Sequence, residues 1–270
     1  MKSNVFLLIL VFYSLASAQV PGCTDPVSSS YNPLATVNNG SCVYPSASIS
    51  PVSSIELPVA VKETSGLVKW NGKLYTHNDG ADTKLYVLDS ISGAVVQSVT
   101  IPGVVNKDWE ELAQDNSHLY IGDFGNNGNG NRNNLKIIKI NKESVLAGAA
   151  TSETINFTYD NQTNFTATGG NNTNFDCEAM IVSADSIYLF TKQWVSKKTS
   201  VYALPKTAGT HVAQLKETYN VGGLITGTAY VEDKRVVVLT GYSNLLQPFL
   251  YLLYDFQGHT FFSGNKRKIG

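Results

Sequence analysis

Two D-x-E pairs place four carboxylates at matching points of an internal repeat. Asp108 and Glu110 form the first pair, and Asp176 and Glu178 form the second. Residues two apart in an extended strand point to the same face, so each pair directs both of its carboxylates the same way. Such a group of oxygens suits Ca²⁺, which takes about six to eight oxygen ligands at about 2.3–2.6 Å. The spacing therefore indicates a calcium site.

Further polar side chains follow the second strand of three repeats. They are His77, Asp79, Asp123 and Lys192. We expect Asp123 to join Asp108, Glu110, Asp176 and Glu178 as a metal ligand. If His77 serves as the acid or base beside Glu110 and Glu178, the same group would support hydrolysis of an ester, lactone or phosphate.

The same carboxylates also have a purely structural interpretation. Buried charges need partners, and these would accept backbone N–H groups between repeats or pair with Lys192 and Arg132. The chain contains no P-loop, G-x-S-x-G, H-E-x-x-H or C-x-x-C motif. The residues thus favour a binding scaffold over an enzyme, with calcium-assisted hydrolysis as the alternative.

A repeated four-strand pattern must position these side chains. Its second strands are marked by Tyr75, Tyr120, Tyr188 and Val237, which recur at intervals of 45, 68 and 49 residues. Short apolar runs alternate with Gly, Asn and Asp turns, and about four strands in about 45 residues are typical of a propeller blade. The sequence predicts an all-β fold, a β-propeller with four visible four-stranded blades.

Both ends of the repeat region bear on whether the ring closes. Residues 55–61 are predicted to form a strand before the first blade, and Lys266 to Ile269 are predicted to give the last blade its own fourth strand. We therefore expect an incomplete propeller, with one or more blades outside this chain. Pairing of residues 55–61 with the strand at 249–256 in a closed four-blade ring would contradict this.

The segment before the propeller divides into three parts. Residues 1–18 resemble a signal peptide, with an apolar run after Lys2 and a small-residue cleavage site, and they predict an exported protein. Residues 19–45 form a turn-rich module that we expect a Cys23–Cys42 disulfide to stabilise. Residues 46–54 are Ser/Pro-rich and predict a linker, so the propeller spans 55–270.

The composition excludes several classes of protein. The chain has 20 Lys and Arg residues against 21 Asp and Glu residues, which argues against a nucleic-acid-binding protein. Hydrophobic residues make up 43% of the chain, enough for a core, so wholesale disorder is excluded. No apolar run reaches the length of about 18 residues that a membrane helix needs.

Two segments carry a family resemblance. Asn106-x-Asp108-Trp109-Glu110, followed by Tyr120 to Asn127 (YIGDFGNN), resembles secreted bacterial β-propeller proteins, and residues 22–42 resemble the short G-C-T-D…G-S-C module of bacterial surface proteins. The resemblance implies a secreted β-propeller. For the scaffold we expect an extracellular protein, a glycan or a small polar ligand as the partner, which the sequence does not identify. A more remote similarity to calcium-dependent propeller hydrolases implies the hydrolase alternative.

Overall fold

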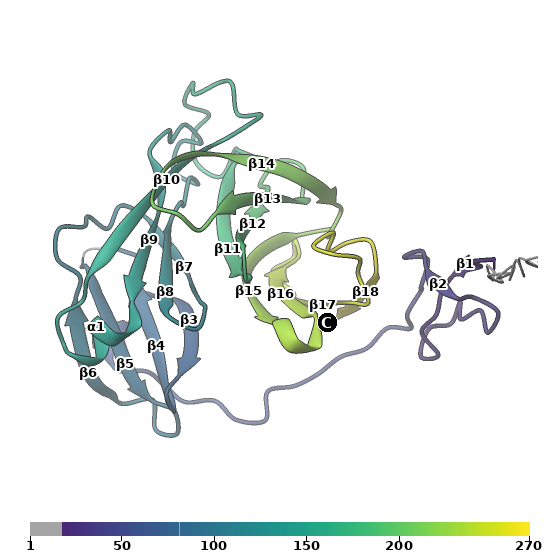
Figure 1. Cartoon of the computed structure of the whole chain (residues 1–270), viewed down its shortest axis with the longest axis horizontal. Coiled ribbons are helices and arrows are strands. Elements are labelled where there is room, and N and C mark those ends of the chain that lie inside the picture. The colour runs from purple at the N-terminus through teal and green to yellow at the C-terminus, as the bar shows by residue number, and fades with distance from the viewer. Residues whose placement is uncertain (1–17, 81) are drawn as a thin grey trace, which may run out of the picture.

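The chain is described by a computed structural model that covers residues 18–80 and 82–270 (Figure 1). The predicted signal peptide lies outside the described residues except for Ala18. Within the described part, no helix is long and apolar enough to cross a membrane. The helical elements are short: η1 (Val59–Val61), α1 (Lys142–Leu146) and η2 (Glu232–Lys234).

The described propeller region contains four antiparallel units of four consecutive strands. The first unit comprises β3 (Thr64–Trp70), β4 (Lys73–Asn78), β5 (Lys84–Asp89) and β6 (Val95–Thr100). The second comprises β7 (Trp109–Gln114), β8 (His118–Asp123), β9 (Leu135–Asn141) and β10 (Ser152–Tyr159). The third comprises β11 (Asp176–Val182), β12 (Ser186–Lys192), β13 (Thr199–Pro205) and β14 (Gly209–Tyr219). The fourth comprises β15 (Leu224–Val231), β16 (Val236–Tyr242), β17 (Pro248–Tyr254) and β18 (Asn265–Ile269).

The units are arranged around a common axis, as in a propeller. Their innermost strands contact one another in the order β3, β7, β11 and β15, and all four line one cavity of about 340 Å³. Parallel pairing of β10 with β14 joins the second and third units into one eight-stranded sheet. The predicted all-β, propeller-like architecture is confirmed, whereas the blade number of the complete ring stays a prediction.

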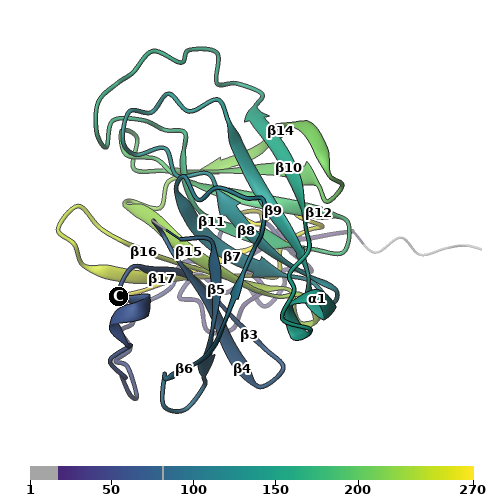
Figure 2. The same ribbon diagram turned by 90° about the vertical axis from the view of Figure 1, so that its left-hand side faces the viewer.

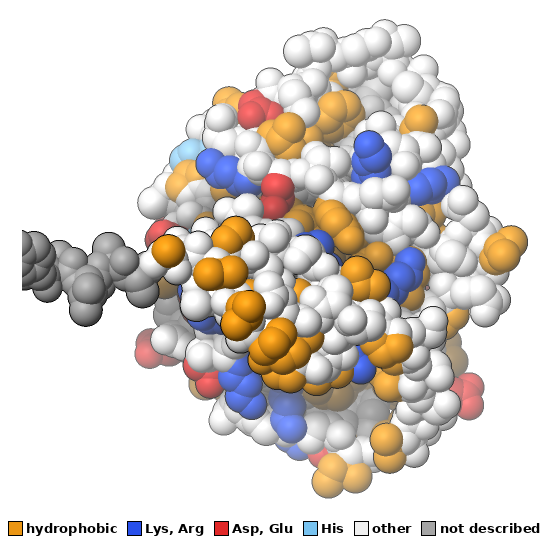
Figure 3. All heavy atoms as spheres, turned by 90° about the vertical axis from the view of Figure 1, so that its right-hand side faces the viewer, with side chains coloured by type: hydrophobic (Ala, Val, Ile, Leu, Met, Phe, Trp, Pro, Cys, Tyr) orange, Lys and Arg blue, Asp and Glu red, His pale blue; other side chains and the backbone are white. Residues whose placement is uncertain are grey.

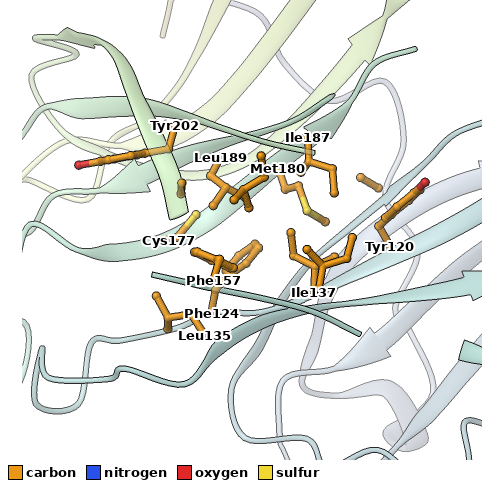
Figure 4. Packing of buried hydrophobic residues seen from close by; sticks show 14 of the residues in the cluster. Tyr120, Phe124, Leu135, Ile137, Phe157, Cys177, Met180, Ile187, Leu189 and Tyr202 are labelled. Carbon is orange, nitrogen blue, oxygen red and sulfur yellow. The ribbon is translucent and has the colours of Figure 1, made fainter. Parts of the chain in front are cut away.

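Strand alternation explains how each unit packs against both neighbours. Successive side chains point to opposite faces of a strand. In β8, Tyr120 therefore faces the third unit, while Leu119 and Ile121 face the first. Figure 4 shows the core between the second and third units, to which Phe157 contributes from the second unit and Leu189 from the third. Figure 2 shows β10 beside β14, where the second and third units join.

The two ends of the repeat region differ in outcome. The predicted fourth strand near Lys266 is confirmed as β18, which pairs with β17. The prediction of a strand over residues 55–61 is wrong. Pro58 precedes a 3₁₀ turn, and Val61 is buried with Tyr86 and Leu88 on the outer face of the first unit. The segment thus covers an open sheet face with side chains rather than pairing its backbone.

The N-terminal module has its own small sheet and a disulfide. Strands β1 (Pro21–Gly22) and β2 (Val37–Asn38) pair in parallel, and Cys23 is bonded to Cys42, which confirms that prediction. The module lies against the fourth unit. Asn38 Nδ2 donates to Asp255 Oδ2 at 2.7 Å and to Asn265 Oδ1 at 2.8 Å.

The segment predicted as a linker also contacts the fourth unit. Gly270 N donates to Ala47 O at 2.9 Å, and Ile49 N donates to Gly270 O at 3.3 Å. The start of this segment therefore lies beside the end of β18.

Candidate functional site

A β-bulge occurs at the same place in the inner strand of every unit. The residues left unpaired are Glu110 in β7, Glu178 in β11 and Thr226 in β15, and β3 is irregular at residues 65–66. A bulge bends its strand and turns the extra side chain in a new direction. The repeat-equivalent glutamates that the sequence singled out are thus the two acidic bulge residues.

Three carboxylates come together at the bulge of β7. Asp79 follows β4, Asp108 precedes β7, and Glu110 is the bulge residue; each offers one oxygen, and these oxygens lie within 4.8 Å of one another. Trp109 N donates to Asp79 O at 3.2 Å, which ties the two loops together. We call Asp79, Asp108 and Glu110 the acidic triad.

Glu110 is the least solvated member of the triad. Its residue is only 8% exposed, and among the described residues no hydrogen bond or ion pair reaches its carboxylate. Burial, followed by the negative charge of Glu178, raises its pKa to about 10. Burial and the Asp79 charge likewise raise the pKa of Asp108 to about 6. Without a cation, Glu110 therefore holds a proton at neutral pH.

Gly125 leaves the space that two triad carboxylates occupy. A Cβ at this position would overlap the side chains of Asp108 and Glu110. Arg132 Nη1 donates to Gly125 O at 2.7 Å and lies 3.9 Å from Asp108 Oδ2, which fixes the loop behind the site. A glycine is therefore required here for the triad to assemble.

Glu178 lies next to the triad but has its own counter-charge. Lys192 Nζ lies 2.5 Å from Glu178 Oε1, and it also lies 4.4 Å from the ring centroid of Trp194 and 5.4 Å from that of Tyr242. Burial raises the pKa of Glu178 to about 7, and Lys192 opposes that shift. The opposite charges of Glu178 and Lys192 thus lie side by side at the bulge end of the central channel, which is the space between the four innermost strands.

The structure does not bring the other predicted ligands into the triad. Asp123 is fully buried and lies 2.7 Å from Arg132 Nη2 and 3.3 Å from Lys136 Nζ. Asp176 accepts hydrogen bonds from Asn126 N at 2.6 Å and from Trp194 Nε1 at 2.7 Å. Both carboxylates therefore have the structural partners that buried charges require.

His77 lies in the core rather than at the surface of the site. It is fully buried, and its ring meets Trp109 edge-on with 5.5 Å between centroids. Burial lowers its pKa to about 4, so the imidazole is neutral at neutral pH. This position offers no support for the predicted acid or base role.

Glu111 is a central residue that sequence reasoning missed. Its carboxylate accepts hydrogen bonds from Leu112 N at 2.9 Å and from Thr228 N at 3.0 Å, which links the second unit to the fourth across the axis. Burial raises its pKa to about 8. The signal available in the sequence was that Glu111 directly follows Glu110. At a bulge, neighbouring side chains point in different directions, so the two glutamates can have different partners.

The opposite end of the channel is polar. A cavity of about 630 Å³ there is lined by Asp115, Lys142 and Lys206, among others. Lys206 Nζ lies 2.6 Å from Asp115 Oδ2, and Lys142 Nζ donates to Asp115 O at 2.6 Å. Asp115 thus has a positive partner in Lys206, unlike Glu110 of the acidic triad.

Comparison with known proteins gives the chain no family. No protein-family model and no curated protein sequence matches it. The RS223 β-xylosidase structure is similar at 12% identity and a TM-score of 0.46, covering 74% of this chain and 71% of that one.

Two further solved structures resemble the chain more distantly. A chain of the mitotic checkpoint complex is similar at 13% identity and a TM-score of 0.37, covering 76% of this chain and 50% of that one. A chain from the S. cerevisiae Dbp5, Nup159 and Gle1 structure is similar at 8% identity and a TM-score of 0.30, covering 77% of this chain and 47% of that one. At these values the likenesses carry no information on function.

Proposed function

We propose that the protein is an exported β-propeller scaffold that binds Ca²⁺ at the acidic triad and uses the bound cation to hold a ligand at that end of the channel. The observation that carries the proposal is the largely buried Glu110 side chain, whose carboxylate has no protein partner among the described residues while two more carboxylates lie within reach. Burying an acidic group without a hydrogen-bond or charge partner destabilises the folded state, and a bound cation would supply that partner.

The donor set favours calcium over other metals. The triad offers only carboxylate oxygens, which suit hard cations, and it lacks the imidazole and thiolate donors that select zinc. Asp79 is exposed, so solvent can supply further oxygen ligands on that side. Ca²⁺ tolerates irregular geometry and mixed protein and water ligands better than Mg²⁺, which demands a near-ideal octahedron.

The remaining features agree with export and with a scaffold role. A disulfide persists in oxidising compartments outside the cytoplasm, and Cys23–Cys42 is such a bond. The bulge residues converge from different units on one end of the axis, where propellers can combine side chains from several blades. We take the four sheet units as blades and a small extracellular molecule as the ligand class.

Calcium titration of matched variants tests the proposal. Isothermal titration calorimetry of the whole protein should show saturable Ca²⁺ binding, and Glu110→Gln should weaken it strongly by removing a ligand charge. Glu56→Gln is the matched control, because Glu56 is exposed and lies outside the site. Equal calcium affinity of the parent protein and Glu110→Gln, or no binding by the parent protein, would overturn the proposal.

A further inference from the structure

The chain has four Asn-Gly pairs, and this dipeptide is the one most open to attack by its own backbone. In that reaction the nitrogen of the following residue attacks the asparagine Cγ and closes a succinimide ring. Glycine carries no side chain that hinders the approach. The pairs begin at Asn39, Asn71, Asn127 and Asn129. Whether each glycine nitrogen can reach its target depends on the local structure, which differs between the four pairs.

Two of the pairs have a glycine nitrogen that is already hydrogen-bonded. Gly40 N donates to Asn38 Oδ1 at 2.9 Å, and Gly130 N donates to Asn126 O at 3.0 Å. A Cβ at Gly130 would lie 2.5 Å from Thr168 Oγ1, so the backbone there has little room to rotate. An attacking nitrogen must first break its hydrogen bond, which lowers the population of the reactive conformation about twofold to tenfold.

The third pair is held in a hairpin turn whose geometry opposes ring closure. Asn71 and Gly72 connect β3 to β4, and their φ angles are +48° and +72°. Residues other than glycine with such a φ occupy the left-handed region, where ψ is about +30 to +60°. At that ψ the Gly72 nitrogen lies anti to the Asn71 Cβ across the Cα–C bond. The ring therefore cannot close unless the turn unfolds.

The pair Asn127-Gly128 meets none of these obstacles. Gly128 is exposed, and a Cβ at its position would have open space around it. Within residues 18–80 and 82–270, its nitrogen donates no backbone hydrogen bond. Asn127 is only partly buried and is not among the residues with positive φ. Of the four pairs, this one therefore has the most accessible geometry for ring closure.

We propose that Asn127 is a modification site, which deamidates spontaneously through the nitrogen of Gly128. That nitrogen forms a bond to Asn127 Cγ, the bond from Cγ to the amide nitrogen breaks, and ammonia leaves with the proton that the Gly128 nitrogen gives up. Water then opens the succinimide ring at either carbonyl and yields aspartate or isoaspartate. One water is consumed for each ammonia released, so the step needs no enzyme, oxidant or reductant.

The product places a negative charge between two loops that carry none. Residues 124–131, which contain Asn127, and residues 161–174 include no Asp, Glu, Lys or Arg. The second loop forms the top of the molecule in Figure 1, and Figure 3, which shares the vertical axis, shows mostly uncharged surface at that end. Asn171 N donates to Asn127 O at 2.7 Å and joins the two loops. Isoaspartate inserts a methylene into the main chain at this joint, so we expect it to weaken the contact.

Peptide mapping by mass spectrometry tests the inference on the whole protein. After incubation in mildly alkaline buffer, each deamidated peptide is heavier by the difference between aspartate and asparagine. Asn127 should convert about twofold to tenfold faster than Asn39 and Asn129, the margin expected from the hydrogen bonds of Gly40 and Gly130. In urea, where the structure is lost, all four asparagines should convert at similar rates.

Three results of this experiment would overturn the inference. The first is an Asn127 that stays intact in the folded protein and converts only in urea. The second is a folded protein in which any other Asn-Gly pair converts as fast as this one. The third is aspartate without isoaspartate at position 127, because direct attack of water on the side-chain amide gives aspartate alone.

Gly128→Ala tests the attacking nitrogen. The new methyl group has open space in the fold but hinders the approach to Cγ, so Asn127 should convert several-fold more slowly at an unchanged melting temperature. Gly170→Ala is the matched control, because Gly170 lies in the facing loop, does not follow an asparagine, and would make only an ordinary Cβ contact of 3.9 Å. Equal rates in the parent protein and Gly128→Ala would refute the route through Gly128. None of these outcomes depends on a metal at the triad, whose residues take no part in the reaction.

Discussion

Calcium binding at the acidic triad should release a proton from Glu110. In the Glu110→Gln variant, calcium binding should release no such proton. Burial and then the charge of Glu178 raise the pKa of Glu110 to about 10, so without a cation the group is protonated at about pH 8. A carboxylate must be ionised to coordinate a metal, so binding and proton release are linked.

The magnitude follows from three of the carboxyls at the site, those of Asp108, Glu110 and Glu178. Burial raises the pKa of Asp108 to about 6 and that of Glu178 to about 7, so both are largely ionised above about pH 8. Of Asp108, Glu110 and Glu178, only Glu110 then still holds a proton. One proton released per calcium bound makes the affinity rise about tenfold, or about 1.4 kcal/mol, for each pH unit between about pH 8 and about pH 9.

Calorimetry in two buffers measures this directly. HEPES and Tris take up a proton with different enthalpies, so the difference in binding heat gives the number of protons released, which should be near one for the parent protein. Any calcium binding that Glu110→Gln retains should be weak and insensitive to pH over this range. A parent protein that releases no proton would refute the assignment of Glu110 as a ligand with a raised pKa.

The raised pKa of Glu110 also makes the free energy of unfolding depend on pH when no calcium is bound. The folded state keeps the Glu110 proton up to a pKa of about 10, whereas the unfolded state loses it near the ordinary value of 4.5. The folded state therefore binds more protons across this window, and stability falls as pH rises, by up to about 1.4 kcal/mol per pH unit. Melting temperatures in EDTA should fall with pH in the parent protein and fall less in Glu110→Gln.

Other predictions concern the loop behind the triad, the axis and the N-terminal module. Gly125→Ala should weaken calcium binding about tenfold or more because its Cβ displaces ligand carboxylates, whereas Gly128→Ala, with open space around its Cβ, should leave the calorimetric affinity unchanged. Glu111→Ala should lose about 1 to 3 kcal/mol more stability in urea unfolding than Glu111→Gln, which keeps an acceptor oxygen for the strand N–H groups; equal losses would contradict that role. Serine at both Cys23 and Cys42 should cost the module about 3 kcal/mol and raise its amide hydrogen exchange, and an increase spread evenly over the sheet units would contradict a local effect.

The repeat and its acidic positions could be predicted because they depend on local patterns. Strand alternation has a period of two residues, so apolar runs with turn residues between them identify strands without knowledge of the fold. Glu110 and Glu178 have the same offset from the next strand, and the structure places both at bulges of inner strands. The fourth strand at Lys266 and the Cys23–Cys42 bond follow from equally local signals.

The division of carboxylates between the triad and the framework was beyond sequence reasoning. Asp123 and Asp79 both end the second strand of a repeat, yet Asp123 is neutralised by Arg132 and Asp79 contributes to the triad. The difference lies in loops whose conformation no periodicity encodes. The covering of the first unit by Val61 was missed for the same reason, since an apolar segment reads alike whether it pairs its backbone or only packs.

The sequence by itself therefore determined the strand repeat, the disulfide-bonded N-terminal module and the set of acidic residues that can meet at the axis. For the strands and the acidic residues, the reason is that spacing along the chain sets the direction in which each strand side chain points. Tertiary structure alone decided which acids are left without a positive partner and where the module and linker lie on the fourth unit. Those outcomes depend on distances between residues remote in sequence, and the energy of a buried charge changes steeply with such distances.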